Sequence, residues 1–448
     1  MMQRDLTHGN VTSSLLLFSL PMILGNLLQQ CYNIADTFIV GRFLGADALA
    51  AVGAAYTLMT FLTSILIGLC MGSSSLFSLY FGKKDEKMMK DCIALSFLFI
   101  SMLAILINGI LFLFIDEILK LLSVPQSIYD MMRSYVWIVF VGIIPIFLYN
   151  FFAFVLRSVG NSIVPLWFLG ISSVMNIILD YLFVVFFRWE IEGAAIATVA
   201  AQLFAGAGIA VYTWIKEREL LPKRTEVTWE KKTMTEVVRF SLAASIQQSV
   251  MNFGILMIQG LINSFGTAVM AAYAAAVKVD SFAYMPAQEY GNAFSIFISQ
   301  NHGAGKKERI RKGTINAVKV SASFCLLVSV VIFVLARYLM MIFVHPEETE
   351  VIRIGVGYLR VEGSFYIGIG ILFLLYGFYR GIEKPEMSVI LTIISLGTRV
   401  LLAYTLAPIK AIGVWGIWWA IPIGWFLADV TGFCVMSRFF KHKTDNQH

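Results

Sequence analysis

The sequence predicts an all-α integral membrane protein with twelve transmembrane helices, arranged as two pseudo-symmetric six-helix lobes around a central cavity. Three features support this fold class: the composition, the length of the apolar stretches and an internal repeat. Of the 448 residues, 58% are hydrophobic and 14% are charged, and the mean hydropathy is +0.78. A soluble domain carries about 25% charged residues because its surface faces water. The composition therefore excludes an ordinary soluble protein.

Uncharged stretches long enough to cross a bilayer recur along the chain. The stretches 92–115 and 134–156 both exceed the ~20 residues that span the hydrocarbon core. The stretch 15–40 is too long for a signal peptide and lacks a small-residue cleavage site, so we expect the first span there. We expect the twelve spans at 15–40, 51–80, 92–115, 134–156, 162–187, 193–215, 240–265, 268–300, 318–343, 361–379, 387–407 and 411–437.

The basic residues between the spans predict the orientation of the chain. The segments on one side hold 23 Lys and Arg residues, and those on the other side hold 8. The basic-rich side of a membrane protein faces the cytoplasm. Because twelve is even, we expect a multi-pass protein of the plasma (inner) membrane with both termini in the cytoplasm. Since basic loops beside spans are normal for membrane insertion, the net charge of +6 does not indicate a nucleic acid partner.

A weak internal repeat divides the chain into two halves. Phe18-Ser19-Leu20 opens the first predicted span and Phe240-Ser241-Leu242 opens the seventh, while Gly82-Lys83-Lys84 is matched by Gly305-Lys306-Lys307. The matches keep their order at an offset of 221 to 223 residues, which favours duplication over the general likeness of apolar helices. Such repeats flank the substrate cavity of secondary transporters. We therefore predict an N-lobe at 1–215 (helices 1–6), a cytoplasmic linker at 216–239 and a C-lobe at 240–448 (helices 7–12).

Ionisable side chains inside spans are functional candidates, because a charge in hydrocarbon is costly. Asp36, Asp180 and Thr198 lie six to eight residues from the predicted external boundary, so all three are about 9–12 Å below it. Asn176 shares a helix face with Asp180, four residues later. Two carboxylates in one low-dielectric site cannot both stay ionised, so we predict that these four residues couple transport to H⁺. The same oxygens also suit Na⁺, and the alternative is a purely structural hydrogen bond between helices.

The first span contains a proline that suits a bending role. Pro21 lies fifteen residues before Asp36 and removes one hydrogen bond of the helix. We predict that the span bends there. A bend that depends on the protonation of Asp36 would couple the ion to the cavity.

The second half carries a different set of polar residues. The repeat places Met257 or Ile258 opposite Asp36, so the acidic site is not duplicated. Lys278, Asp280 and Arg399 are expected at similar depths, where they either form a structural ion pair or contact substrate. The remaining predicted lining of the substrate cavity consists of Gln247, Gln248, Asn252 and Gln259 on the seventh span.

Several of these segments together resemble the multidrug and toxic compound extrusion (MATE) family, of the bacterial NorM and DinF type. The resemblance rests on the Phe-Ser-Leu-Pro opening of the first span, on Asp36-Thr37 followed by Gly41 and Leu44-Gly45, on 157–160, on 176–180 and on 192–198. It implies export of amphipathic or cationic compounds in exchange for H⁺ or Na⁺ by alternating access. It also implies that Asp36, Asn176, Asp180 and Thr198 form the cation or proton site and that Pro21 is the bending proline.

The sequence departs from the family pattern in one respect. Some bacterial members carry a C-lobe sodium site with acids on helices 7 and 10. Here the seventh span offers glutamines, and the tenth has only Glu362, which we expect at its external edge. This departure favours proton coupling in the N-lobe.

Other classes of protein are disfavoured by missing motifs. The sequence contains no HExxH, GxSxG or GxxxxGK[ST] pattern, and its five cysteines form no CxxC. We therefore expect a monomeric carrier in the lipid bilayer, with no enzymatic activity, no cofactor and no metal other than a coupling Na⁺. The alternative is a flippase of the same superfamily for lipid-linked oligosaccharides or peptidoglycan precursors. Such a flippase would need basic residues for a pyrophosphate, and Lys278 and Arg399 are the chief ones available.

Overall fold

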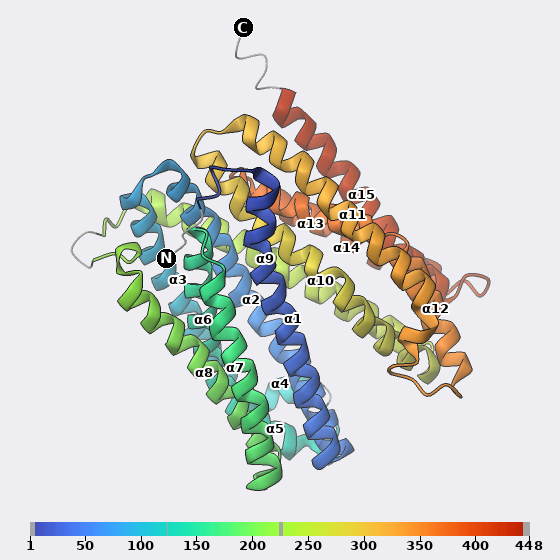
Figure 1. Cartoon of the computed structure of the whole chain (residues 1–448). Coiled ribbons are helices and arrows are strands. Elements are labelled where there is room, and N and C mark those ends of the chain that lie inside the picture. Colours follow the sequence, from blue (N-terminus) through green and yellow to red (C-terminus); the bar gives the residue numbers. More distant parts are fainter. Residues whose placement is uncertain (1–4, 123, 224–226, 442–448) are drawn as a thin grey trace. The chain divides into compact units, whose positions relative to one another are not determined.

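The computed structural model describes residues 5–122, 124–223 and 227–441, which are mostly helical and contain no strand (Figure 1). The predicted cytoplasmic ends 1–4 and 442–448, and residues 224–226 of the predicted linker, lie outside the described residues. The chain forms two compact units. Unit 1 contains Leu20–Ser245, and unit 2 contains Leu6–Ser19 and the chain from Ile246 onward.

Unit 1 is built from most of the helices of the first half. They are α1 (Val11–Phe43) from Leu20 on, α2 (Ala46–Lys83), α3 (Glu86–Leu113), α4 (Ile115–Leu121), η1 (Gln126–Ile128), α5 (Tyr129–Val141), α6 (Ile143–Ser158), α7 (Ile163–Asp180), η2 (Tyr181–Phe186), α8 (Glu190–Lys216), η3 (Arg218–Leu220) and the start of α9 (Lys231–Asn263). The helix α9 therefore begins inside the predicted linker 216–239 and supplies residues to both units, as α1 does.

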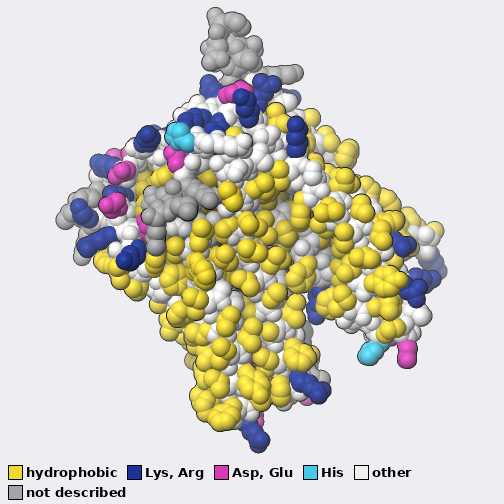
Figure 2. Space-filling view, viewed as in Figure 1, with side chains coloured by type: hydrophobic (Ala, Val, Ile, Leu, Met, Phe, Trp, Pro, Cys, Tyr) yellow, Lys and Arg dark blue, Asp and Glu magenta, His cyan; other side chains and the backbone are white. Residues whose placement is uncertain are grey.

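Unit 2 contains the end of α9 and six further helices. They are α10 (Thr267–Gly303), α11 (Lys307–Met340), α12 (Thr349–Gly363), α13 (Tyr366–Gly381), α14 (Pro385–Leu406) and α15 (Val414–Lys441). Figure 2 shows hydrophobic side chains over most of the visible flanks of both units, with basic side chains gathered toward the helix ends. This distribution is that of helices surrounded by hydrocarbon along their middles and by water at their ends.

Among the described residues, ten helices are long and apolar enough to span a membrane. The pair α12 and α13, bent by 51°, forms an eleventh candidate span. The helix α10 has 37 residues, and it contains Lys278, Asp280 and Glu289. Its length is that of a span, but these charged residues lower its hydropathy. The helix α10 therefore corresponds to the predicted span 268–300, although its composition is less apolar than that of the other spans.

A close crossing of α2 and α9 lies within unit 1. A Cβ atom at Gly72 would lie 2.1 Å from the carbonyl oxygen of Phe240, so the two backbones touch where glycine leaves room. Beside it, the hydroxyl groups of Ser73 and Ser241 are 2.7 Å apart and share a hydrogen bond. Small residues allow close helix packing of this kind in a bilayer.

Basic residues of α11 and its N-cap hold the segment Leu6–Gly9 against unit 2. The guanidinium group of Arg309 donates hydrogen bonds to the carbonyl oxygens of Leu6, His8 and Gly9 at 2.6–3.1 Å. The ammonium group of Lys306 donates to the carbonyl oxygen of Thr7 at 2.8 Å. The basic residues after α10 thus hold the segment Leu6–Gly9 in place and add positive charge to this end of unit 2.

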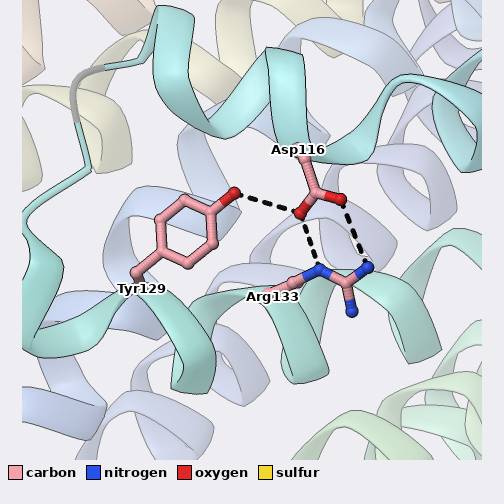
Figure 3. Close-up of polar contacts among 3 residues, drawn as sticks. All are labelled: Asp116, Tyr129 and Arg133. Atoms are coloured by element: carbon pink, nitrogen blue, oxygen red, sulfur yellow. Dashed lines mark hydrogen bonds and ion pairs between the residues drawn. The ribbon is translucent and has the colours of Figure 1, made fainter.

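A polar cluster joins α4 to α5 in unit 1 (Figure 3). Arg133 donates two hydrogen bonds to the carboxylate of Asp116, at 2.7 Å and 3.3 Å, and the hydroxyl of Tyr129 donates a third at 3.0 Å. These bonds, chiefly those from Arg133, hold the pKa of Asp116 below its ordinary value. The cluster ties the short helix α4 to the start of the following span.

Candidate functional site

Asp180 ends α7 and is completely buried. The chain continues directly into η2, a π-helix over Tyr181–Phe186. A π-helix widens the spacing of backbone hydrogen bonds, and such segments are frequent at functional sites. No feature of the amino-acid sequence indicates this widened segment.

The carboxyl group of Asp36 on α1 lies within hydrogen-bonding reach of Asp180. Both carboxylate oxygens of Asp180, and Oδ1 of Asp36, are buried without a donor from any described residue. A hydrogen bond between two carboxyl groups requires a proton on one of them. The structure therefore brings the two predicted acids together in a geometry that a single proton would satisfy.

The other two predicted residues flank this pair. Asn176 lies one turn before Asp180 and is 2% exposed, and neither polar atom of its amide has a described hydrogen-bond partner. Thr198 on α8 is half-buried and lies within hydrogen-bonding reach of Tyr135 on α5. The site is thus assembled from α1, α5, α7 and α8, and it contains several polar atoms without partners.

Two tyrosines that sequence reasoning missed belong to the same site. Tyr135 is buried close to Asp36 and Asp180, and Tyr32 lies one turn before Asp36, also close to both acids. Tyr135 falls within the uncharged stretch 134–156, where it gave no sign of a polar role. The spacing of four residues between Tyr32 and Asp36 was the available signal, because it places both on one helix face.

Pro21 lies inside α1, which is helical from Val11 to Phe43. It comes just after Ser19, the last residue that α1 contributes to unit 2. The missing hydrogen bond of the proline therefore falls where the helix passes from one unit to the other. Its bending role stays a prediction.

A second buried polar cluster lies in unit 2, around Asp280. The hydroxyl of Tyr366 donates a 2.6 Å hydrogen bond to Asp280. Glu362 and Arg399 are close enough to Asp280 to interact electrostatically, and they are 4% and 9% exposed. Tyr358 lies within hydrogen-bonding reach of Glu362. The cluster thus joins two acids and one arginine from α10, α12 and α14.

The sequence-based placement of Glu362 at the external edge of a span is wrong. The helix begins at Thr349, and α12 and α13 form one bent pair, so Glu362 lies inside the pair rather than at its end. The predicted span began only at residue 361, because α12 contains charged residues that interrupt the apolar pattern before that point. The position of Glu362 therefore no longer argues against a cation site in the C-lobe.

Lys278 is not part of the buried cluster. Its side chain is exposed, and its ammonium group lies 5.8 Å from the centre of the Phe343 ring, whereas Asp280 is buried. Two residues along an α-helix differ by about 200° in direction. Of the predicted trio, the structure brings together only Asp280 and Arg399.

The predicted cavity residues of α9 lie in the part of that helix that belongs to unit 2. Gln247 is buried, and Gln248, Asn252 and Gln259 are half-buried. The amide of Asn252 donates to the carbonyl oxygen of Gln248 at 3.1 Å, and that of Gln259 donates to Asn263 at 2.9 Å. Their assignment to a substrate cavity stays a prediction.

Comparison with known proteins identifies the family. The MatE family model matches residues 21–182 and again residues 242–405. The chain belongs to the MatE family. The two matches begin 221 residues apart and end 223 residues apart, which is the offset of the predicted repeat. The MatE family consists of transporters, so the chain is a multi-pass transport protein.

Known MatE proteins match over nearly the whole chain. The chain is 32% identical over 394 residues to "Probable multidrug resistance protein YpnP" of Bacillus subtilis, covering 87% of both chains. It is 25% identical over 419 residues to "Probable multidrug resistance protein NorM" of Thermotoga maritima, covering 91% of this chain and 88% of that protein. A solved outward-facing MATE transporter superposes with a TM-score of 0.92 at 22% identity, covering 98% of both chains. This likeness confirms the predicted fold class of twelve helices in two lobes.

Proposed function

We propose that this MatE chain is a secondary multidrug exporter, which moves amphipathic or cationic compounds out of the cell in exchange for H⁺ by alternating access. The observation that carries the proposal is the buried contact between Asp36 and Asp180, in which both oxygens of Asp180 and Oδ1 of Asp36 have no other described donor. Two carboxyl groups this close are stable when they share a proton and repel each other when both are ionised. The site therefore has the chemistry of a proton carrier rather than that of an enzyme.

The coupling follows from where the two acids lie. Asp180 is fixed on α7 next to the π-helix, whereas Asp36 lies on α1, which contains Pro21. A shared proton holds α1 against α7, and its loss leaves two negative charges in contact. Because a helix bends most easily where proline removes a hydrogen bond, the repulsion would move α1 about Pro21. Protonation and the shape of the transport path are then linked through one helix.

The same oxygens also suit Na⁺, because carboxylate, amide and hydroxyl oxygens are hard ligands. Proton coupling is preferred because the contact between Asp36 and Asp180 is satisfied by one proton with no further ligand. Drug export is preferred over flipping of a lipid-linked oligosaccharide because Lys278 is exposed and Arg399 lies among acids. The two relatives above are named as probable multidrug resistance proteins, which also supports drug export.

The decisive experiment is dye efflux from proteoliposomes that contain the purified protein. With an imposed pH gradient and no sodium, the wild type should export a cationic dye, and a protonophore should abolish export. Asp36→Asn should remove gradient-driven export and leave dye binding intact, while Asp47→Asn, at an exposed carboxylate of unit 1, should behave as the wild type. Full export by Asp36→Asn, or export that requires sodium and ignores the protonophore, would overturn proton coupling at this site.

We also propose that the protein lies in the plasma (inner) membrane with both termini in the cytoplasm. The support is the excess of basic residues in one set of loops, 23 against 8. A cysteine introduced as Lys410→Cys should react with a membrane-impermeant maleimide in intact cells, whereas Lys84→Cys should react only after lysis. The opposite pattern would reverse the orientation.

A further inference from the structure

A cavity of about 810 Å³ lies in unit 2, beside the end of α11, the length of α12 and the start of α15. One face of α12 forms its floor, because Thr349, Arg353, Val356 and Arg360 recur at helical spacing. We call it the arginine pocket. Its lining includes three arginines, a glycine and two tryptophans: Arg337, Arg353, Arg360, Gly357, Trp415 and Trp419.

The lining of the arginine pocket is positively charged. Arg337, Arg353 and Arg360 line it, and none of its lining residues is acidic. Within the described part of the chain, no carboxylate lies at ion-pair distance from these three guanidinium groups. Arg360 lies 5.2 Å from the centre of the Phe333 ring. Three like charges in one pocket favour an anion, and the guanidinium fork matches a phosphate in particular.

The remaining wall of the pocket is apolar and aromatic. Trp415 and Trp419 are about half-exposed there, as is Phe365. Gly357 keeps the space open, because a Cβ atom at this position would lie 3.1 Å from the Trp415 ring. A free inorganic anion would gain nothing from an apolar surface, whereas the glycerol and acyl chains of a phospholipid would bury it and so stabilise binding.

The pocket opens on a helix that faces hydrocarbon. Most of the apolar length of α11 is exposed, and only 22% of its most apolar 18 residues are buried inside the structure. Val330, Val334 and Tyr338 are exposed along this helix, close in sequence to the pocket residues Phe333 and Arg337. Exposed Trp and Tyr beside basic residues mark the level of lipid headgroups. These neighbours indicate that the arginine pocket lies at the level of lipid headgroups.

We propose that the arginine pocket binds the phosphate headgroup of an anionic phospholipid. Arg353 and Arg360 on α12 and Arg337 on α11 contact the phosphate oxygens, and the glycerol and upper acyl chain lie on Trp415 and Trp419. The bound lipid joins α11, which is peripheral, to α12 and α15. The site is separate from Asp36 and Asp180, so it does not depend on the proposed proton coupling.

Native mass spectrometry of the purified full chain in detergent tests this proposal. The probes are phosphatidylglycerol, phosphatidylcholine and inorganic phosphate, each titrated separately. The paired variant Arg353→Gln/Arg360→Gln should weaken phosphatidylglycerol binding about tenfold or more, because it removes two of the three guanidinium groups that would bind the phosphate. The matched control Arg42→Gln/Lys120→Gln removes two exposed charges from unit 1 and should change the affinity less than twofold.

A second variant changes the shape of the pocket and leaves its charge unchanged. Gly357→Leu fills the space beside Trp415 but keeps all three arginines, so it should also weaken phosphatidylglycerol binding. This variant remains informative if the paired arginine variant fails to fold. Equal affinity for phosphatidylglycerol and phosphatidylcholine, or wild-type binding by Gly357→Leu, would overturn the proposal. Inorganic phosphate that competes fully at millimolar concentration would identify a free-anion site and overturn the lipid assignment.

Discussion

Replacing Asp180 by asparagine separates a functional role of this residue from a structural one. Asp180 is completely buried, and both its carboxylate oxygens lack a donor unless a proton is shared with Asp36. Asparagine has nearly the same shape, is always neutral and carries an NH₂ group that can donate to Asp36. Asp180→Asn therefore supplies the missing donor permanently and removes the titratable group.

At a pH high enough to remove the shared proton from the wild-type pair, the expected gain in the free energy of unfolding is about 1–3 kcal/mol, and the gain should shrink where the proton is still shared. This is the usual cost of one buried polar group without a partner, and a charged group costs more. The same substitution should abolish pH-driven export, because the pair can no longer release its proton. Greater stability combined with lost transport is the pattern of a residue kept for function.

The measurement is chemical unfolding in detergent micelles at pH 7 and at higher pH, combined with dye efflux from proteoliposomes. Asp47→Asn is the matched control, and it should change the free energy of unfolding by less than about 0.5 kcal/mol because Asp47 is exposed. A variant Asp180→Asn that is less stable than the wild type but still exports dye would refute the reasoning. Asp180 would then be a structural group whose carboxylate is stabilised in the fold.

Two further predictions concern unit 1. Gly72→Ala should lower the free energy of unfolding by about 1–3 kcal/mol, because its Cβ would lie 2.1 Å from a carbonyl oxygen of α9. Gly53→Ala on the same helix meets no atom within 4 Å and should be neutral or slightly stabilising; equal losses would contradict the close crossing. Asp116→Asn should lower the melting temperature at pH 7, where the ionised Asp116 accepts its hydrogen bonds. Because the folded-state pKa of Asp116 is lowered, this stabilisation is present above its unfolded pKa of about 4 and is lost as the pH falls through the folded value. The two melting temperatures should converge in acid, and a constant gap from pH 7 to pH 3 would show that the ionised carboxylate is not what stabilises the structure.

The sequence determined the features that the bilayer imposes on a chain. A spanning segment must be a long apolar helix with all its backbone hydrogen bonds internal, so composition and length predicted the fold class. Asp36 and Asp180 were identifiable as candidates because a charged side chain inside a span is costly. Their matching depth predicted that they would share one site. The repeat was visible because duplicated halves keep the same offset between equivalent positions.

The tertiary structure decided which of the remaining polar residues share a site. Lys278 and Asp280 lie at one depth, but they point to different sides of α10, and only the packing of α12 and α14 brings Glu362 and Arg399 to Asp280. Tyr135 lies close to the two acids because of how α5 packs against other helices of unit 1. The residues next to Tyr135 in the sequence do not indicate this packing. Depth follows from position along a helix and can be counted, whereas direction depends on which neighbouring helix each face meets. The paired acids were therefore predictable from the sequence, and the groups that surround them were not.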